Sequence, residues 1–181
     1  MSEAIEQLAN QAIQHRRKNK LGDARHAWAE AVELSRQEND IPSLIRALRG
    51  AAQIDHDLDR DSEALALYEE AVALCGKHSP PLALAHTVRH LGDIQRHMGH
   101  HRLAQASYEQ ALAIYRSQPE ADPLDVANAL RPFALLKEAT GDLDGARDFW
   151  REARGLYESL GIDAGVIECS DHLAKLGEPG R

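Results

Sequence analysis

Small and apolar residues recur along the chain at helical spacing, and the whole pattern repeats about every 40 residues. Four segments begin with an alanine, at Ala24, Ala64, Ala104 and Ala146. In each segment an aromatic residue follows at offset 4, a second alanine at offset 7 and an aliphatic residue at offset 10. These offsets lie on one face of a helix, so each segment is predicted to be an α-helix with one buried face.

A second helix is predicted ahead of each segment, because a small residue recurs twelve positions before each leading alanine, at Ala12, Ala52, Gly92 and Ala134. Turn-forming residues separate the two helices of each pair, at residues 21–23, 59–62, 99–101 and 141–142. Between pairs, side chains that can cap a helix precede Pro42, Pro81 and Pro123. The repeating unit is therefore a helix–turn–helix, used four times, over about residues 4–39, 41–79, 81–119 and 123–160.

One more helix is predicted over about residues 163–177, with Asp163 as its cap. A single apolar stripe runs along it, formed by Val166, Cys169, Leu173 and Leu176. Its other face is polar, as expected at the exposed end of a repeat array, with Glu168, Asp171, His172 and Lys175. The chain is therefore predicted to be a single all-α domain, residues 1–181, with nine helices stacked in a solenoid.

The repeated motif resembles that of the tetratricopeptide repeat (TPR) family: a small residue in the first helix, a Gly-Asp type turn, then alanine, an aromatic residue and alanine. The period of 40 to 42 residues is similar to that of the long-repeat branch, which includes kinesin-light-chain-like and bacterial regulatory TPR proteins. The first aromatic position of the family motif is instead aliphatic here, at Leu8, Leu48, Val88 and Leu130. The resemblance implies a right-handed α-solenoid with a concave face lined by the first helix of each pair. It also implies a non-catalytic adaptor or scaffold that binds a protein partner.

Arginine recurs three residues before the small residue of the first helix in repeats 2 to 4, at Arg49, Arg89 and Arg131. The resemblance places this position on the concave face, where it helps to bind peptides. Other residues expected on that face are Arg16, Arg17, Arg46, His86, His90, Asp93, Arg96 and His97. Guanidinium groups offer a planar pair of donors that matches a carboxylate. The three arginines at one repeat position, called the arginine ladder below, therefore predict a groove for an acidic or carboxylate-terminated peptide segment. The expected affinity is roughly micromolar.

Three alternatives stay open at this point. The arginines can be solvated or paired with neighbours such as Asp93, four residues after Arg89. The groove can instead serve a regulatory module that binds a small anionic ligand or nucleic-acid phosphates. Finally, the chain can be a self-assembling scaffold that dimerises through an apolar solenoid end containing Ile5 and Leu8.

The net charge of −8, from 21 Lys and Arg against 29 Asp and Glu, makes nucleic acid an unlikely partner, because duplex affinity depends on neutralising phosphates. The acidic excess falls mainly on the predicted outer helices, at Glu30, Glu33, Glu69, Glu70, Glu109, Glu152 and Glu158. A basic inner face is therefore compatible with an acidic molecule.

Five of the ten histidines cluster, at His86, His90, His97, His100 and His101. The pairs His86/His90 and His97/His101 have the i,i+4 spacing that can bring two imidazoles to one metal when both lie in one helix. Ordinary polar groove residues are the preferred interpretation, and no metal site is predicted. A groove that gains positive charge below about pH 6.5 is the alternative.

Several motifs and segments are absent from the sequence, and their absence argues against certain classes of protein. No phosphate-binding loop, zinc-protease motif, Cys-x-x-Cys or serine elbow is present, so neither enzymatic activity nor a cofactor is predicted. Two cysteines, no apolar run of membrane-spanning length and no basic, apolar leader favour a cytoplasmic protein without a membrane partner. Pro132 is expected to kink its helix beside Arg131.

Overall fold

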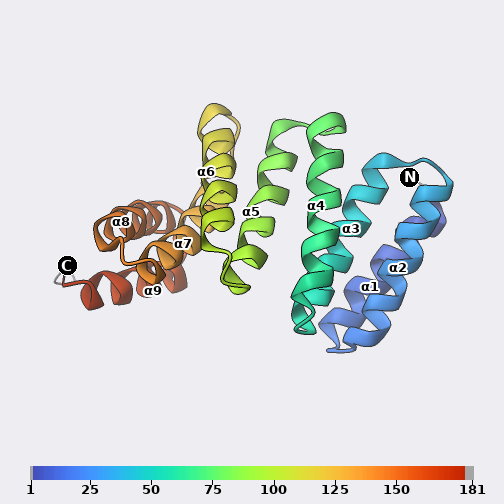
Figure 1. Ribbon diagram of the computed structural model, residues 1–181, viewed down its shortest axis with the longest axis horizontal. Helices are drawn as coiled ribbons and strands as arrows, with labels where there is room; N and C mark the ends of the chain where they lie inside the picture. The colour runs from blue at the N-terminus through green and yellow to red at the C-terminus, as the bar shows by residue number, and fades with distance from the viewer. Residues whose placement is uncertain (1, 178–181) are drawn as a thin grey trace.

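The computed structural model describes residues 2–177, in which nine α-helices and no strand are found. The helices are α1 (Glu3–Arg17), α2 (Leu21–Gln37), α3 (Ile41–Asp57), α4 (Asp61–His78), α5 (Pro81–His97), α6 (His101–Ser117), α7 (Pro123–Ala139), α8 (Leu143–Ser159) and α9 (Asp163–Lys175). They stack in chain order from α1 and α2 at one end to α9 at the other (Figure 1). The predicted all-α solenoid of paired helices with a C-terminal helix is thereby confirmed.

The turns within the helix pairs share one backbone feature. Asn19, Asp59, Gly99 and Gly141 all have positive φ, between 56° and 82°. These residues lie at one repeat position, directly after the first helix, where a left-handed residue commonly ends a helix. Asparagine, aspartate and glycine are the residue types that tolerate this conformation best.

Two of the predicted turns are placed too late in the sequence. Residues 21–23 lie inside α2 and residues 61–62 lie inside α4, because the left-handed residue ends the turn earlier. Asp40 and Asp122 cap α3 and α7 as predicted, accepting from the backbone N–H groups of Ser43 and Leu124. Asp163, in contrast, is the first residue of α9 and not its cap.

The core lies both within the helix pairs and between neighbouring pairs. The four leading alanines and the alanines seven positions later are fully buried, and the aromatic residues between them are at most 5% exposed. Small residues on the facing helices allow this contact: a Cβ atom added at Gly50 would lie 2.3 Å from the Trp28 ring, and one at Gly92 would lie 2.9 Å from the Tyr108 ring. The alternation of small and aromatic residues therefore sets how closely the helices approach.

Both ends of the array are packed. At the C-terminal end, Cys169 and Leu173 of α9 are buried in the cluster that also contains Trp150 and Tyr157. At the N-terminal end, Ile5 and Ala12 of α1 are buried, and Leu8 packs against the core. The expectation of an exposed apolar N-terminal end is therefore wrong. Within residues 2–177 none of the helices has the length and apolar character of a membrane span.

Candidate peptide-binding groove

Two adjoining pockets lie along the first helices of repeats 2 to 4. The first has a volume of about 270 Å³ and is lined mainly by α3, α5 and α7, with Gln53, His56, Tyr68, Arg89, His90, Asp93, Ile94, Arg96, Asn128, Arg131 and Pro132. The second, of about 290 Å³, is lined by Ile13, Trp28, Arg46, Arg49, Gly50, Gln53, Tyr68 and His90. Gln53, Tyr68 and His90 line both, so the two pockets form one elongated groove.

Arg49 of α3 is a half-buried cation with no hydrogen bond or ion pair to any described residue. Burial lowers the pKa of its guanidinium, and the nearby charge of Arg89 acts in the same direction. An arginine keeps its charge at neutral pH under any such shift. Arg49 therefore presents an uncompensated positive charge to the groove.

Arg89 of α5 is more enclosed, with a side chain that is 12% exposed. It lies 2.7 Å from His90 Nε2 through one terminal nitrogen, and 3.6 Å from Asp93 Oδ2 through the other. Its Nε atom is buried without a hydrogen-bond partner, as is the hydroxyl group of the neighbouring Tyr115. Buried polar groups are normally paired, so these atoms have unused hydrogen-bonding capacity.

Arg131 of α7, the third arginine of the ladder, has a partner that its own repeat does not supply. Its Nε and one terminal nitrogen each donate to the carboxylate of Glu168 in α9, at 2.7 Å. This pair raises the pKa of Arg131 and lowers that of Glu168, because each charge stabilises the other. Helix α9 thus neutralises Arg131, the last arginine of the ladder.

His86 and His90 lie side by side on α5, with ring centroids 4.8 Å apart. Burial, followed by the charges of Arg49, His90 and Arg89, lowers the pKa of His86 to about 3. Burial also lowers the pKa of His90, against an opposing hydrogen bond from Asp93. The expectation that these two histidines give the groove a positive charge below pH 6.5 is therefore wrong.

The histidine pairs with i,i+4 spacing do not form metal sites. Both ring nitrogens of His90 have partners, because Nδ1 lies 3.2 Å from Asp93 Oδ2 and Nε2 lies 2.7 Å from Arg89. His97 ends α5 and His101 begins α6, so that pair does not lie in one helix. His97 lines neither pocket and instead contacts Asp61, with Nδ1 and Oδ2 2.5 Å apart.

Three of the remaining predicted groove residues line the two pockets, whereas His86, Arg16 and Arg17 line neither. Arg46 belongs to the second pocket, and Arg96 belongs to the first, with its Nε atom buried and unpaired. Asp93 accepts a hydrogen bond from the Tyr108 hydroxyl at 2.9 Å. Pro132 is buried in α7, which continues as one helix through it. Arg16 lies outside both pockets and forms an ion pair with Asp57, with Nε and Oδ2 2.6 Å apart.

The groove also contains residues that were not predicted for it, among them Gln53, Tyr68 and Asn128. Asn128 occupies the repeat position of Arg46 and His86, so the register of the repeats already contained the signal for it. Tyr68 was assigned to the core, and it is buried, but its ring also borders both pockets and stacks on His90. A side chain can therefore belong to the core and to the groove at once.

The architecture is that of a TPR-like repeat solenoid, and solved structures of this class match nearly the whole chain. RapI in its apo form is similar, with a TM-score of 0.89 at 12% identity over 98% of this chain and 64% of that protein. A kinesin light chain-type protein with TPR-like repeats from Podosopora anserina gives 0.80 at 15% identity, over 97% and 87%. The tetratricopeptide repeat protein of the STAND ATPase class from Pyrococcus horikoshii gives 0.80 at 16% identity, over 95% and 26%.

No protein-family model and no curated protein matches the sequence. At identities of 12% to 16%, the structural matches show the fold alone.

Proposed function

We propose that the groove binds an acidic or carboxylate-terminated segment of another protein, and that the molecule acts as a non-catalytic interaction scaffold. The observation that carries this proposal is Arg49, a half-buried cation in the groove without a counter-ion among the described residues. Holding such a charge away from water costs free energy in the unbound protein. An incoming carboxylate recovers that cost and gains charge-assisted hydrogen bonds.

The surroundings of Arg49 favour an anion over other ligands. Arg89 contributes a second enclosed cation, with a buried, unpaired Nε. Arg46 and Arg96 lie in the same groove. Asp93, the acid that contacts Arg89 at 3.6 Å, also accepts from Tyr108 and contacts His90, so it neutralises Arg89 incompletely.

The arrangement of the two pockets, side by side along the array, suits an extended peptide. The two pockets here measure about 270 and 290 Å³ and adjoin each other along the row of first helices. An extended chain can occupy both, with carboxylates reaching Arg49 and Arg89.

The test is fluorescence anisotropy with a labelled ten-residue peptide rich in Asp and Glu that ends in a free carboxylate. The double variant Arg49→Gln/Arg89→Gln is expected to bind at least about tenfold more weakly, since each charge-assisted bond contributes about 1.5–3 kcal/mol. Reversal of Arg49, Arg89 and Arg131 to Glu is expected to abolish binding while helicity by circular dichroism stays unchanged.

The matched control is Arg36→Gln, which removes an arginine that pairs with Glu33 and Glu70 on the outer helices. It is expected to leave the affinity unchanged. Equal affinity of wild type and the double variant, or equal binding of a lysine-rich peptide, would contradict the proposal. Tight binding of duplex DNA with a steep salt dependence would point to phosphates as the ligand.

A further inference from the structure

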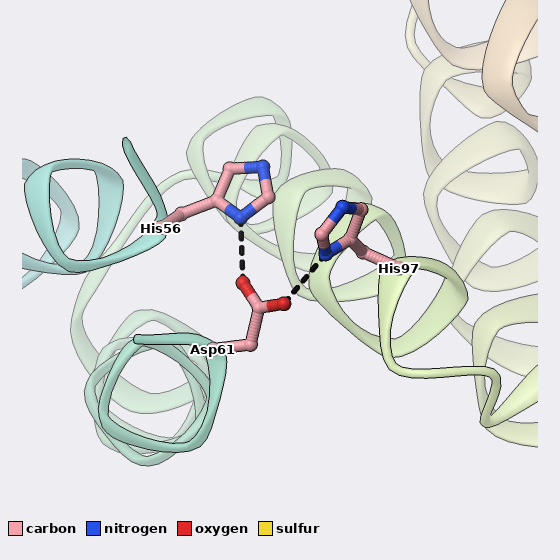
Figure 2. A group of neighbouring side chains, drawn as sticks. All are labelled: His56, Asp61 and His97. Atoms are coloured by element: carbon pink, nitrogen blue, oxygen red, sulfur yellow. Dashed lines mark hydrogen bonds and ion pairs between the residues drawn. The ribbon is translucent and has the colours of Figure 1, made fainter. Parts of the chain in front are cut away.

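Three side chains from two adjacent repeats converge beside the groove. His56 lies near the C-terminus of α3, Asp61 is the first residue of α4 and His97 is the last residue of α5 (Figure 2). Each imidazole presents its Nδ1 atom to a different oxygen of the Asp61 carboxylate, at 2.7 Å for His56 and 2.5 Å for His97. The potential ligand atoms of the three side chains all lie within 4.8 Å of one another. Within residues 2–177, no second group of three or more His, Cys, Asp or Glu side chains meets this condition.

We propose that His56, Asp61 and His97 bind a divalent transition-metal ion, with Zn²⁺ as the best match. Two imidazole nitrogens and one carboxylate oxygen form a ligand set that suits zinc, with water in the fourth position. Calcium and magnesium prefer sites made of oxygen ligands, so the two nitrogens argue against them. A tetrahedral zinc site places its ligand atoms roughly 3.3 Å apart, at bond lengths of about 2.0–2.1 Å.

The side chains must rearrange to reach that geometry. Each nitrogen must move away from the carboxylate oxygen that it contacts by less than about 1 Å, and ligand atoms that lie farther apart, within the 4.8 Å span of the group, must come closer together. The His97 side chain is 52% exposed, so its ring can rotate and water can reach the ion. For each histidine to coordinate through Nδ1 in its neutral form, the proton must move to Nε2, which is the usual requirement for an imidazole ligand.

Among the described residues, no Lys or Arg forms an ion pair with Asp61. The partners found for its carboxylate are the two imidazoles. The neighbouring Arg60 points to Glu63 instead, with Nε and Oε1 3.4 Å apart. Asp61 is therefore a partly buried carboxylate, 18% exposed, with two imidazoles as its neighbours.

The repeat geometry explains why these residues meet. One junction earlier in the array, Arg16 and Asp57 occupy the repeat positions of His56 and His97, and they form an ion pair with Nε and Oδ2 2.6 Å apart. The fold thus brings these two positions together at consecutive junctions. An ion pair joins repeats 1 and 2, and a metal at the second junction would join repeats 2 and 3.

The experiment is isothermal titration calorimetry of the full chain, free of any affinity tag, with Zn²⁺ at pH 7.5 and at pH 5.5. One ion per chain is expected at pH 7.5, with weaker binding at pH 5.5, because protons compete for the imidazoles. His56→Gln, His97→Gln and Asp61→Asn are each expected to weaken binding by about tenfold or more, since even indirect supports of a metal site contribute that much.

Two controls separate this site from other histidines. His26→Gln removes an exposed histidine that lies 3.2 Å from Glu30, and His86→Gln removes a histidine of α5 outside the cluster; both are expected to leave the Zn²⁺ affinity unchanged. The visible spectrum of bound Co²⁺ gives a second measurement, because a four-coordinate complex absorbs strongly and the His56→Gln/His97→Gln double variant would lose that band. Circular dichroism of the metal-free variants checks that they fold.

Three outcomes would overturn the proposal: no binding by the wild type at pH 7.5, unchanged affinity in both single histidine variants, or an equal loss in His26→Gln. The first would assign the cluster as a hydrogen-bonded bridge between repeats. The other two would place the ion at a different histidine.

Discussion

Arg49, Arg89 and Arg131 occupy one repeat position and yet have three electrostatic environments. Arg49 lacks a partner among the described residues, Arg89 has a partial one and Arg131 has a bidentate one in Glu168. The position of each arginine follows from the repeat, but its partner comes from whichever helix packs next to it. The ligand-binding capacity of the ladder is therefore expected to be greatest at Arg49 and lowest at Arg131.

Glu168→Gln tests this order directly. Without the carboxylate of α9, Arg131 becomes available to a ligand, so the affinity for the acidic peptide is expected to rise about two- to fivefold. That range corresponds to the roughly 0.5–1 kcal/mol of a partly exposed ion pair. The matched control is Glu152→Gln, which releases Arg116 on the outer helices and is expected to change nothing. If the two variants behaved alike in the anisotropy assay, Arg131 would not belong to the binding surface.

His86 predicts a pH dependence of stability. Its pKa is about 3 in the folded chain, because burial and the charges of Arg49, His90 and Arg89 disfavour protonation. The unfolded chain takes up the proton near pH 6.5. The free energy of unfolding therefore keeps its full value above pH 6.5 and decreases as the pH falls below it.

Urea unfolding at pH 7 and pH 5 measures this effect. Wild type is expected to lose more unfolding free energy than His86→Gln over that interval, by at most about 2 kcal/mol, which is one proton over 1.5 pH units. Equal losses in the two proteins would show that His86 titrates normally. Peptide affinity, in contrast, is expected to change little between pH 7.5 and pH 6, because the cations proposed to bind the peptide are guanidinium groups.

At the scale of the helices, the spacing of alanine and aromatic residues predicts the four outer helices and the buried face of each. The small residues twelve positions earlier predict the first helix of each pair, and the apolar stripe after residue 163 predicts the last helix. The turns were harder, because glycine and aspartate at Gly22 and Asp23 resemble a turn but lie inside α2. The informative residue was Asn19, whose repeat position carries the left-handed conformation. Contacts between repeats, such as Arg131 with Glu168 or His56 with His97, depend on how the helices stack and have no signature within one repeat.

Gly50 shows how narrow the tolerance of that stacking is. A methyl group at this position would lie 2.3 to 2.6 Å from three carbon atoms of the Trp28 ring. Gly50→Ala is therefore expected to lower the free energy of unfolding by about 1–3 kcal/mol, the usual cost of overpacking. The measurement is urea denaturation followed by circular dichroism.

Gly76→Ala in α4 is the matched control, because no atom lies within 4 Å of the added methyl group. There the higher helix propensity of alanine is expected to raise stability by up to about 1 kcal/mol. A loss of stability in Gly76→Ala equal to that in Gly50→Ala would mean that the effect comes from the helix backbone and not from the contact with Trp28.

At the scale of the whole molecule, the solenoid is held together by contacts between neighbours in the array. Ion pairs join outer helices of successive repeats, as between Arg36 and Glu70 or between Arg116 and Glu152. The stability of such an array is approximately a sum of repeat and interface contributions. Removing a unit from one end should therefore remove one interface and leave distant repeats folded.

Deletion of residues 162–181 makes this argument testable, because it removes α9 and uncovers one face of α8. The loss of the buried side chains Cys169 and Leu173, at about 1.5–3 kcal/mol for a fully buried aliphatic residue, should lower the unfolding free energy by several kcal/mol. Tyr157 would lose its cover as well, because it packs against Gly165. The truncated chain is expected to self-associate at concentrations where the full chain does not, since an exposed apolar face favours association.

The same deletion also removes Glu168 and thereby releases Arg131 from its ion pair. If the groove binds acidic segments, the truncated chain should bind the peptide at least as tightly as Glu168→Gln does, although it is less stable. Analytical ultracentrifugation over a concentration series measures the self-association, and anisotropy measures the binding. A truncated chain that stayed monomeric and lost its affinity for the peptide would mean that α9 takes part in binding the ligand, and does not simply cover α8 and neutralise Arg131.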